Sequence, residues 1–325
     1  MSIINIREAE REGARLVIGL GGISGSGKTF TALQLAWGLA KGNAKKVGLL
    51  DTENRRGSLY ANSLVDTKGE VHKFLIGDLY APFSPQRYKD AIMEFQEAGV
   101  EVLVIDSVSH EWEGIGGCED IANAGDPKTP RWNKAKAEHK AFMNALLASD
   151  MHIIVCMRAR EKVKLVKVNG KTEFESQGVL PIQEKNFVFE LTASLMMWNE
   201  GKEQAVMKCP AELREILGRQ SGYISARDGL ALRKWVDGGA KVDPAIQAAQ
   251  NTLRTVTEQG MAALEAAWKK QPKEMRDTLG ADFLDELKRS AQNFDQQREL
   301  AATGDGQAVD DLNDSVLGNT AQAAT

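Results

Sequence analysis

The sequence predicts an α/β fold in which a mainly parallel sheet is flanked by helices, and three observations support this prediction. Short apolar segments alternate with helical patterns over residues 15–208, which is typical of a doubly wound parallel sheet. A glycine-rich stretch at residues 22–29 joins the first apolar segment to the first helical pattern. The apolar segment 47–51 ends in an acid, and Asp106 directly follows the apolar segment 100–105.

The expected elements can be justified in chain order. Residues 1–14 form a polar lead-in. Helix 84–99 has a serine at its cap, a proline at its first position and a glycine at its end. Segment 100–105 has almost no polar break, as expected of a strand covered on both faces. The predicted strands are 15–21, 47–51, 71–76, 100–105, 151–157, 191–198 and 204–208. The predicted helices of this part are 30–40, 84–99 and one that begins near Thr129-Pro130.

The composition changes near residues 238–244, beyond which the chain is rich in Ala, Glu, Gln and Lys with helical spacing. Helices are expected at 244–259, 261–271 and 281–297. From residue 300 the chain lacks periodicity and large apolar groups, which is typical of disorder. The predicted organisation is an N-terminal arm (1–14), a core (15–240), a small helical appendage (244–298) and a disordered acidic tail (299–325).

Composition narrows the class of protein. The 325 residues are 42% hydrophobic and 26% charged, as in ordinary globular proteins. No apolar run approaches the ~20 residues of a membrane span, and residues 1–12 lack the apolar centre of a signal peptide. The cysteines, at 118, 156 and 209, show neither disulfide nor metal spacing, and the four histidines show no metal-ligand or triad spacing. We therefore expect a reduced, cytoplasmic protein without a membrane partner.

Charge is distributed unevenly. The net charge is −4, and the segment 301–325 contains four aspartates and no Lys or Arg. That segment accounts for the whole net charge, so residues 1–300 are neutral. A neutral body does not attract nucleic acid in bulk, although local loops can still bind it. The acidic tail either recruits another protein or only keeps the chain soluble.

Residues 22–29 read Gly-Ile-Ser-Gly-Ser-Gly-Lys-Thr, which is the complete Walker A pattern of a phosphate-binding P-loop. The predicted strand before it and helix after it are the context that the motif needs. Glycines let backbone N–H groups face a phosphate, and the helix directs its positive end to the same place. We expect Lys28 to reach the β- and γ-phosphates of ATP and Thr29 to bind Mg²⁺. The residues expected to hold the nucleotide here are Gly22, Ile23, Ser24, Gly25, Ser26, Gly27, Lys28, Thr29 and Phe30.

Two acidic motifs refine this prediction. Val104-Ile-Asp-Ser107 closes a buried strand with an acid in the Walker B arrangement, so Asp106 is expected to hold Mg²⁺, usually through water. Leu50-Asp-Thr-Glu53 ends the strand after the P-loop helix, and Glu53 is expected to orient and deprotonate the attacking water. Asp51 is expected to brace the same loop. The competing interpretations are strands that merely end at solvated acidic turns.

Together, Asp-Thr-Glu at 51–53 and Val-Ile-Asp-Ser at 104–107 resemble the RecA-type ATPase core. The resemblance implies a RecA-like P-loop NTPase that uses ATP and Mg²⁺, with Glu53 as the catalytic carboxylate. Strand 152–157 resembles the strand after which RecA proteins place a γ-phosphate sensor. That sensor is commonly Gln, and Arg158 occupies its place here.

A closer similarity is to shortened, phage-encoded RecA-like ATPases. Their cores add a strand ending in Met-Arg, a lysine-rich hairpin and a closing Leu-x-x-Trp-x-x-Gly-Gly. This chain has Met157-Arg158 and the closing motif at 232–239, so the resemblance covers about residues 14–239. Some members of that group anneal single strands in phage recombination. The resemblance implies single-stranded DNA as partner, assembly into a ring or filament, and the host-cell cytoplasm as location.

RecA-like proteins contact DNA through two loops, after Walker B and after the sensor strand. The first corresponds to residues 111–131, which are Gly-rich but carry several acids. The second corresponds to 161–175, a predicted hairpin around Asn169-Gly170. Three glutamates leave this hairpin at a net +1, and a solvated hairpin or subunit contact is the alternative. Phe174 offers a stacking face for bases. Nothing resembles a major-groove reading helix, which favours single strands. The DNA-binding candidates are Arg160, Lys162, Lys164, Lys167 and Lys171.

Lys208 ends the last predicted strand. RecA-type filaments insert a basic residue from one subunit into the ATP site of the next, and Lys208 is the candidate for this role; the alternative is an ordinary strand-end lysine. Three other functions stay open from the sequence. They are a small-molecule kinase, a RecA-fold motor (a helicase or packaging ATPase), and a nucleotide-switched binding module with negligible turnover.

Overall fold

The computed structural model describes residues 15–124, 129–168, 171–239 and 244–303. The chain divides into two compact units. The larger comprises Arg11–Ala240, and the other comprises Lys241–Thr325 with Met1–Glu10. The predicted arm at 1–14 lies outside the described residues. The functional division into arm, core, appendage and tail stays a prediction.

The larger unit is built on a central sheet with the order β10-β9-β1-β7-β6-β2-β5, and β8 pairs with β7. All pairs from β9 to β5 are parallel, whereas β10 and β8 run antiparallel to their neighbours. The strands are β1 (Val17–Gly22), β2 (Val47–Asp51), β5 (Leu75–Asp78), β6 (Val102–Asp106), β7 (His152–Val168), β8 (Lys171–Pro181), β9 (Ala193–Trp198) and β10 (Glu203–Lys208). A mostly parallel sheet flanked by helices confirms the predicted fold class.

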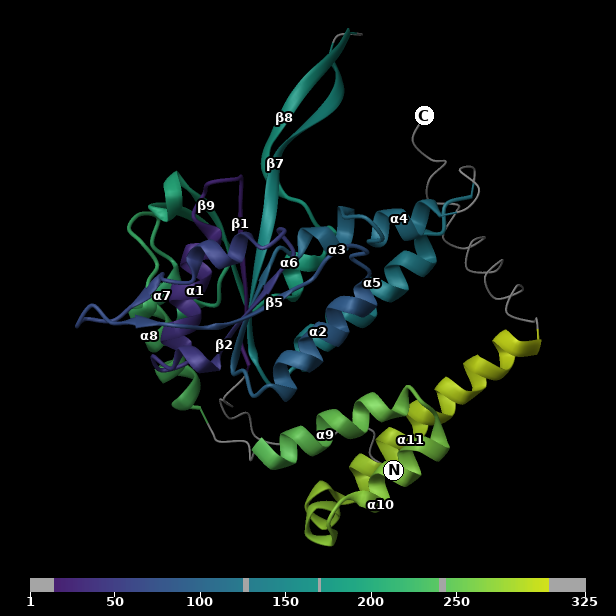
Figure 1. Cartoon of the computed structure of the whole chain (residues 1–325). Helices are drawn as coiled ribbons and strands as arrows, with labels where there is room; N and C mark the ends of the chain where they lie inside the picture. Colours follow the sequence, from purple (N-terminus) through teal and green to yellow (C-terminus); the bar gives the residue numbers. More distant parts are fainter. Residues whose placement is uncertain (1–14, 125–128, 169–170, 240–243, 304–325) are drawn as a thin grey trace. The chain divides into compact units, whose positions relative to one another are not determined.

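Two layers of helices cover the sheet (Figure 1). On one face, α1 (Lys28–Leu39) and α8 (Ala226–Asp237) bury an apolar core with β1, β2 and β6. On the other face, α2 (Pro85–Glu97) and α5 (Trp132–Ala148) bury a second core. Strands β1, β2 and β6 are buried along their whole length, which explains why their sequences lack the alternation of half-exposed strands.

Two predictions of local structure were wrong in detail. The Gly-rich segment 111–131 contains helices rather than one open loop: α3 (Ser109–Glu113), α4 (Cys118–Asn123) and the approach to α5. The predicted strand 71–76 splits into two, because β4 (Val71–His72) pairs with β3 (Leu64–Val65) while β5 joins β2 in the main sheet. Two further short helices are α6 (Phe187–Glu190) and α7 (Arg214–Leu217), and short 3₁₀ turns occur at 44–46, 56–60, 199–201 and 211–213.

The P-loop helix α1 is held against α8 by an unusually close backbone crossing. A Cβ atom added at Gly38 would lie 1.9 Å from the carbonyl oxygen of Ala226. A Cβ atom added at Gly229 would lie 2.1 Å from the carbonyl oxygen of Leu35. Only glycine on both helices permits this approach. The crossing therefore fixes α1, and with it the start of the P-loop helix, relative to α8.

Strand β7 continues far beyond the sheet. Its first part pairs with β1 and β6, and from Ala159 to Val168 it pairs with β8 as an antiparallel hairpin. Figure 1 shows this hairpin projecting away from the helical layers. The predicted turn Asn169-Gly170 lies outside the described residues. One central strand of the sheet thus continues into a projecting hairpin.

The smaller unit contains α9 (Pro244–Thr257), α10 (Met261–Lys270) and α11 (Lys273–Thr303), with a non-helical Gly280 inside α11. Its apolar core is made of Ala249, Leu253, Leu264, Leu279, Leu287 and Ala291. Helix α11 extends into the first residues of the tail predicted at 299–325, because Glu299 to Ala302 are good helix formers. Residues 304–325 lie outside the described part. Within the described ranges, no helix combines the length and apolar character needed to cross a membrane.

Candidate nucleotide-binding site

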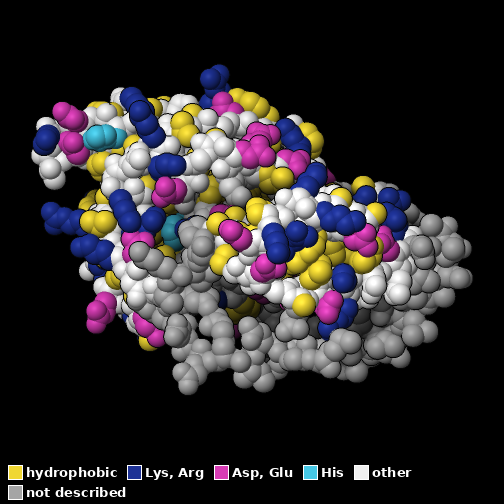
Figure 2. All heavy atoms as spheres, turned by 90° about the horizontal axis from the view of Figure 1, so that it is seen from below, with side chains coloured by type: hydrophobic (Ala, Val, Ile, Leu, Met, Phe, Trp, Pro, Cys, Tyr) yellow, Lys and Arg dark blue, Asp and Glu magenta, His cyan; other side chains and the backbone are white. Residues whose placement is uncertain are grey.

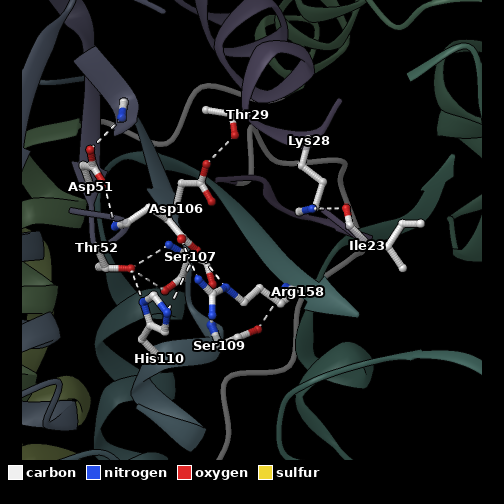
Figure 3. Close-up of polar contacts among 12 residues, drawn as sticks. Ile23, Lys28, Thr29, Asp51, Thr52, Asp106, Ser107, Ser109, His110 and Arg158 are labelled. Carbon is white, nitrogen blue, oxygen red and sulfur yellow. Dashed lines mark hydrogen bonds and ion pairs between the residues drawn. The ribbon is translucent and has the colours of Figure 1, made fainter. Parts of the chain in front are cut away.

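The P-loop connects β1 to α1 and has the backbone that its glycines permit. Gly25 and Gly27 adopt φ values of 79° and 86°, in the left-handed region that favours glycine. A Cβ atom added at Gly22 would lie 2.3 Å from Ser26 Oγ, so the loop folds tightly on itself. Lys28 Nζ donates to the carbonyl oxygens of Gly22 (2.9 Å) and Ile23 (2.8 Å) (Figure 3). The side chain of Lys28, the predicted phosphate-binding lysine, therefore lies along the P-loop.

Thr29 and Asp106 meet at the carboxyl end of β6. Thr29 Oγ1 donates to Asp106 Oδ2 at 2.5 Å (Figure 3). Burial, with a smaller contribution from the charge of Glu53, outweighs the hydrogen bond from Thr29 and the charge of Lys28 and raises the pKa of Asp106 to about 6. A hydroxyl and a carboxylate oxygen directed at one point beside a phosphate loop are ligands that suit Mg²⁺. The residues present therefore fit the predicted metal.

Asp51 organises the loop that carries Glu53. Asp51 Oδ1 accepts a hydrogen bond from the backbone N–H of Glu53 (2.6 Å), and Oδ2 accepts one from the N–H of Gly57 (2.7 Å). The Asp51 side chain is buried. Because both oxygens accept backbone donors, this carboxylate fixes the turn and leaves Glu53 as the acid that faces the site.

Glu53 is held by Arg158, the residue at the predicted sensor position. Arg158 Nε donates to Glu53 Oε1 (2.8 Å) and Nη2 donates to Oε2 (2.5 Å), a bidentate ion pair. Burial raises the pKa of Glu53, but the hydrogen bonds and charge of Arg158 outweigh it and hold the pKa below its usual range. Glu53 is therefore ionised, and its negative charge is balanced by the guanidinium of Arg158. Sequence reasoning placed both residues at the site without indicating that they pair.

Sequence reasoning missed three residues whose contacts support Glu53, Arg158 and the Walker B turn. Thr52 Oγ1 accepts from the N–H of Ser107 (2.8 Å) and lies 2.8 Å from His110 Nδ1. His110 Nε2 lies 4.0 Å from Glu53 Oε1. Ser109 Oγ accepts from the N–H of Arg158 (3.0 Å). The sequence assigned no role to His110; its position four residues after Asp106, at the start of the helix that follows the Walker B strand, was the available signal.

These groups surround one cavity of about 420 Å³. Lys28, Thr29, Glu53, Asp106 and Arg158 all contribute to its lining. Ser24, Gly25 and Asp51 line it as well, together with Arg56, Leu59, Tyr60 and Glu113, which the sequence did not indicate. The structure thus brings together four separate sequence segments that were each predicted to contact nucleotide. Among the P-loop residues, Ile23 and Phe30 have exposed side chains outside this lining.

The remaining candidates lie elsewhere. Arg160 follows Arg158 on β7 and forms an ion pair with Glu113 (3.4 Å). Lys162 lies further along the hairpin. The backbone of Lys164, Lys167 and Lys171 is also paired in the hairpin, opposite Glu175, Thr172 and Val168 respectively. The side chains of these three lysines are outside the described ones. Lys208 Nζ donates to the carbonyl oxygen of Phe189 in the same chain, away from the cavity.

Comparison with known families decides the class. A family model described as an AAA domain matches residues 14–186, slightly more than half of the chain. The chain belongs to this AAA-domain family. The match spans β1 to β8, including the whole β7–β8 hairpin, and it contains Lys28, Glu53, Asp106 and Arg158. The P-loop and the other residues that line the cavity's polar side therefore lie in an AAA domain.

Comparison with solved structures gives matches to 101 chains. One of these is a KaiC-like protein from the hyperthermophilic archaeon Pyrococcus horikoshii OT3. It is 15% identical to this chain, with 62% of this chain and 81% of that chain covered and a TM-score of 0.35. The comparison with curated proteins gave no match.

Proposed function

We propose that this AAA-domain protein hydrolyses ATP and acts on single-stranded DNA, in the annealing or strand-pairing steps of phage recombination. The observation that carries the proposal is the convergence of Lys28, Thr29, Asp106 and Glu53 on one cavity. A phosphate loop supplies charge stabilisation, and a carboxylate at its edge supplies a group that orients water. The single-strand and phage settings rest on the sequence resemblance and on the hairpin.

The chemistry assigned to the site is attack of water on the γ-phosphorus, with cleavage of the β–γ bond and release of ADP and phosphate. Thr29 and Asp106 would hold Mg²⁺, which would supply positive charge at the phosphates. Backbone N–H groups of the P-loop and the ammonium group of Lys28 face the phosphate oxygens and stabilise the charge that develops on them. Glu53 accepts the hydrogen bond of the attacking water.

Arg158 connects nucleotide occupancy to Glu53. A guanidinium binds a carboxylate and a phosphate with the same bidentate geometry. In the proposed cycle the γ-phosphate competes with Glu53 for Arg158, and the carboxylate that is released then faces the water. Arg158 would thus pair with Glu53 before ATP binds and stabilise the charge of the γ-phosphate after ATP binds.

The DNA part of the proposal rests on the continuity of β7. The strand that ends its sheet pairing at Arg158 carries Arg160 and Lys162 directly into the projecting hairpin. Basic and acidic side chains are interspersed on the face shown in Figure 2, without one extended basic area there. Binding through a local element is therefore favoured over bulk attraction. The first DNA loop expected from the resemblance is helical, which favours the hairpin as the contact.

The test is ATP hydrolysis with and without single-stranded DNA. We expect DNA to stimulate turnover, and both Lys28→Ala and Glu53→Gln to abolish it. Replacement of Lys162, Lys164, Lys167 and Lys171 by Gln should remove the stimulation while basal turnover stays. Acceleration of complementary-strand pairing over bare DNA tests the annealing role. Turnover that is indifferent to DNA would instead favour a motor or a switch that acts on a protein partner.

We further propose that the protein assembles as a ring or filament and that Lys208 reaches the ATP site of a neighbour. Lys208 ends β10, the edge strand of the sheet, which supports a position at a subunit boundary. Mass photometry with and without ATP measures the assembly. If Lys208→Ala leaves both assembly and turnover unchanged, the assignment of Lys208 is wrong.

A further inference from the structure

Three buried side chains of different chemistry meet beside the nucleotide site, each from a different helix. Glu111 lies on α3, Cys118 on α4 and His139 on α5. Cys118 Sγ lies 3.1 Å from Glu111 Oε1, and His139 Nδ1 lies 3.0 Å and 3.1 Å from the two carboxylate oxygens. One ligand atom from each residue lies within 4.8 Å of the other two. Spacing along the chain does not indicate this cluster, because its members are 7 and 21 residues apart.

The cluster is almost completely removed from solvent. Glu111 and Cys118 are 0% exposed and His139 is 7% exposed. Burial raises the pKa of the Cys118 thiol, and the charge of Glu111 raises it further, so the sulfur carries its proton in this state. A buried carboxylate is costly unless its charge is matched. The only cationic or potentially cationic contact recorded for Glu111 among the described residues is His139.

We propose that Glu111, Cys118 and His139 form a zinc site. The carboxylate, imidazole and thiolate are the three ligand types that zinc uses, and three protein ligands leave a fourth position open. One Zn²⁺ ion is neutralised by the Glu111 carboxylate and the Cys118 thiolate, with His139 bound as neutral imidazole. The proton of the thiol leaves to solvent on binding.

The dimensions suit the ion. Zinc binds sulfur at about 2.3 Å and nitrogen or oxygen at about 2.0–2.2 Å, so tetrahedral ligand atoms lie roughly 3.4–3.6 Å apart. The separations of Glu111 from Cys118 and from His139, 3.0–3.1 Å, require these side chains to part by only a few tenths of an ångström, and the Cys118 and His139 ligand atoms lie within 4.8 Å of each other. The carbonyl oxygen of Ala135 lies 3.7 Å from Cys118 Sγ, so a further oxygen borders the same centre.

A cavity gives the ion a route to the cluster. It has a volume of about 450 Å³ and lies between α5 and α6. His139 forms part of its lining, together with the acidic residues Glu184 and Glu190 and the basic residues Lys136 and Lys140. Although the cluster itself is buried, one of its three ligands therefore borders a space that solvent ions can enter.

A zinc ion at this cluster would connect helix α3, which lies beside the nucleotide pocket, to helices α4 and α5. Helix α3 is only five residues long and carries His110, 4.0 Å from Glu53, and Glu113, which pairs with Arg160. Glu111 lies between them. Zinc bound to Glu111 would fix α3 to α4 and α5. It would therefore hold His110 beside Glu53, and Glu113 beside Arg160 of β7. This consequence rests on the proposed function; the binding of zinc does not.

The experiment is metal binding by the full chain. After purification with Zn²⁺ and removal of loose metal, we expect about one tightly bound ion per chain. Replacement by Co²⁺ should give an ultraviolet thiolate-to-metal band, which the Mg²⁺ site does not produce because it has no sulfur. Cys118→Ser should abolish the band, and Glu111→Gln and His139→Gln should each weaken metal binding at least tenfold.

Two controls separate this site from other ligands in the chain. Cys209→Ser removes a half-buried thiol outside the cluster and should leave the band unchanged. His72→Gln removes one member of the Asp66, Glu70 and His72 group and should also leave it unchanged. Circular dichroism and ATP binding verify that each variant is folded. A wild-type chain that takes up no zinc, or a band that persists in folded Cys118→Ser, would overturn the proposal.

Discussion

At the scale of single residues, the ion pair between Glu53 and Arg158 has the clearest consequences. It places a matched charge pair where the proposed reaction needs a free carboxylate and a cation for phosphate. Both of its hydrogen bonds are formed through the guanidinium fork, which lysine cannot reproduce. The pair therefore tests whether Arg158 serves the chemistry or only restrains Glu53.

Arg158→Ala is expected to lower kcat for ATP hydrolysis by about 10²-fold, because a cation that stabilises transferring phosphate is lost. ATP binding should change by only a few fold, since Lys28 and the P-loop backbone stay in place. Steady-state kinetics with a separate nucleotide-binding titration measures the two effects, and Arg158→Lys is the matched control that keeps the charge but not the fork. An increase in turnover would show that Arg158 is an inhibitory clamp instead.

Asp51 gives a second residue-scale prediction. Asp51→Asn replaces one of the two carboxylate acceptors by an N–H₂ donor, so the backbone N–H of Glu53 or of Gly57 loses its partner. We expect hydrolysis to fall at least tenfold through displacement of Glu53, with nucleotide affinity nearly unchanged. If Asp51→Asn is as active as the wild type, the loop does not depend on this acid.

His152 makes stability depend on pH. Its Nδ1 accepts the N–H of Leu16 (3.1 Å), and burial, with the charges of Arg15 and Arg233, lowers its pKa from 6.5 to about 3. The folded state therefore excludes a proton that the unfolded state takes up below pH 6.5. This contribution to stability is complete above pH 6.5 and is lost as the pH falls from 6.5 toward 3, by about 1.4 kcal/mol per pH unit.

Urea unfolding of wild type and His152→Asn between pH 7.5 and pH 5 measures this effect. Asn keeps an acceptor for Leu16 but does not titrate in this range. The difference in unfolding free energy between the two proteins should shrink as the pH is lowered. A difference that is constant with pH would mean that His152 has the same pKa in the folded and unfolded states.

At the scale of elements, the crossing of α1 and α8 is the most demanding contact in the described larger unit. Gly38→Ala and Gly229→Ala would each force a methyl group against backbone of the other helix. Since backbone cannot rotate away as a side chain can, we expect a loss of at least about 2 kcal/mol of stability. Arg227→Ala on the exposed face of α8 is the control and should change stability by less than about 0.5 kcal/mol. Chemical denaturation measures all three, and a neutral Gly38→Ala would contradict the crossing.

How far the sequence predicted the site depends on how local each signal is. The P-loop, Asp106 and the loop of Asp51 and Glu53 were found because each is a short motif at the end of an apolar strand. The pairing of Glu53 with Arg158 was not found, because 105 residues separate them and only the order of the sheet brings β2 and β7 near each other.

The same reasoning applies to elements. Strands and helices with strong periodicity were predicted to within a few residues, as for β6 and α2. The segment 111–131 was interpreted as a loop because its glycines and acids outweigh any helical period. Its two short helices are held instead by tertiary contacts, chiefly Cys118 and Ala122 against Ala135 and the stacked pair Trp112 and Trp132.

At the scale of the whole molecule, the chain contains two units with separate apolar cores. Leu253 is fully buried in the core of the helical unit. Leu253→Ala should destabilise that unit by about 2–5 kcal/mol, while nucleotide affinity at the P-loop stays the same. Calorimetry with ATP titration measures both quantities. Loss of ATP binding in this variant would show that the two units are energetically coupled.

The glycine crossing also affects how mutational data on this protein should be interpreted. In a saturation screen scored only by ATP turnover, positions 38 and 229 would tolerate no replacement, just as position 28 would not. At position 28, activity would be lost because the side chain no longer contacts phosphate. At positions 38 and 229, it would be lost because α1 and α8 can no longer pack closely against each other. A parallel measurement of protein abundance separates the two classes, since variants at position 28 should accumulate normally and those at 38 and 229 should be degraded.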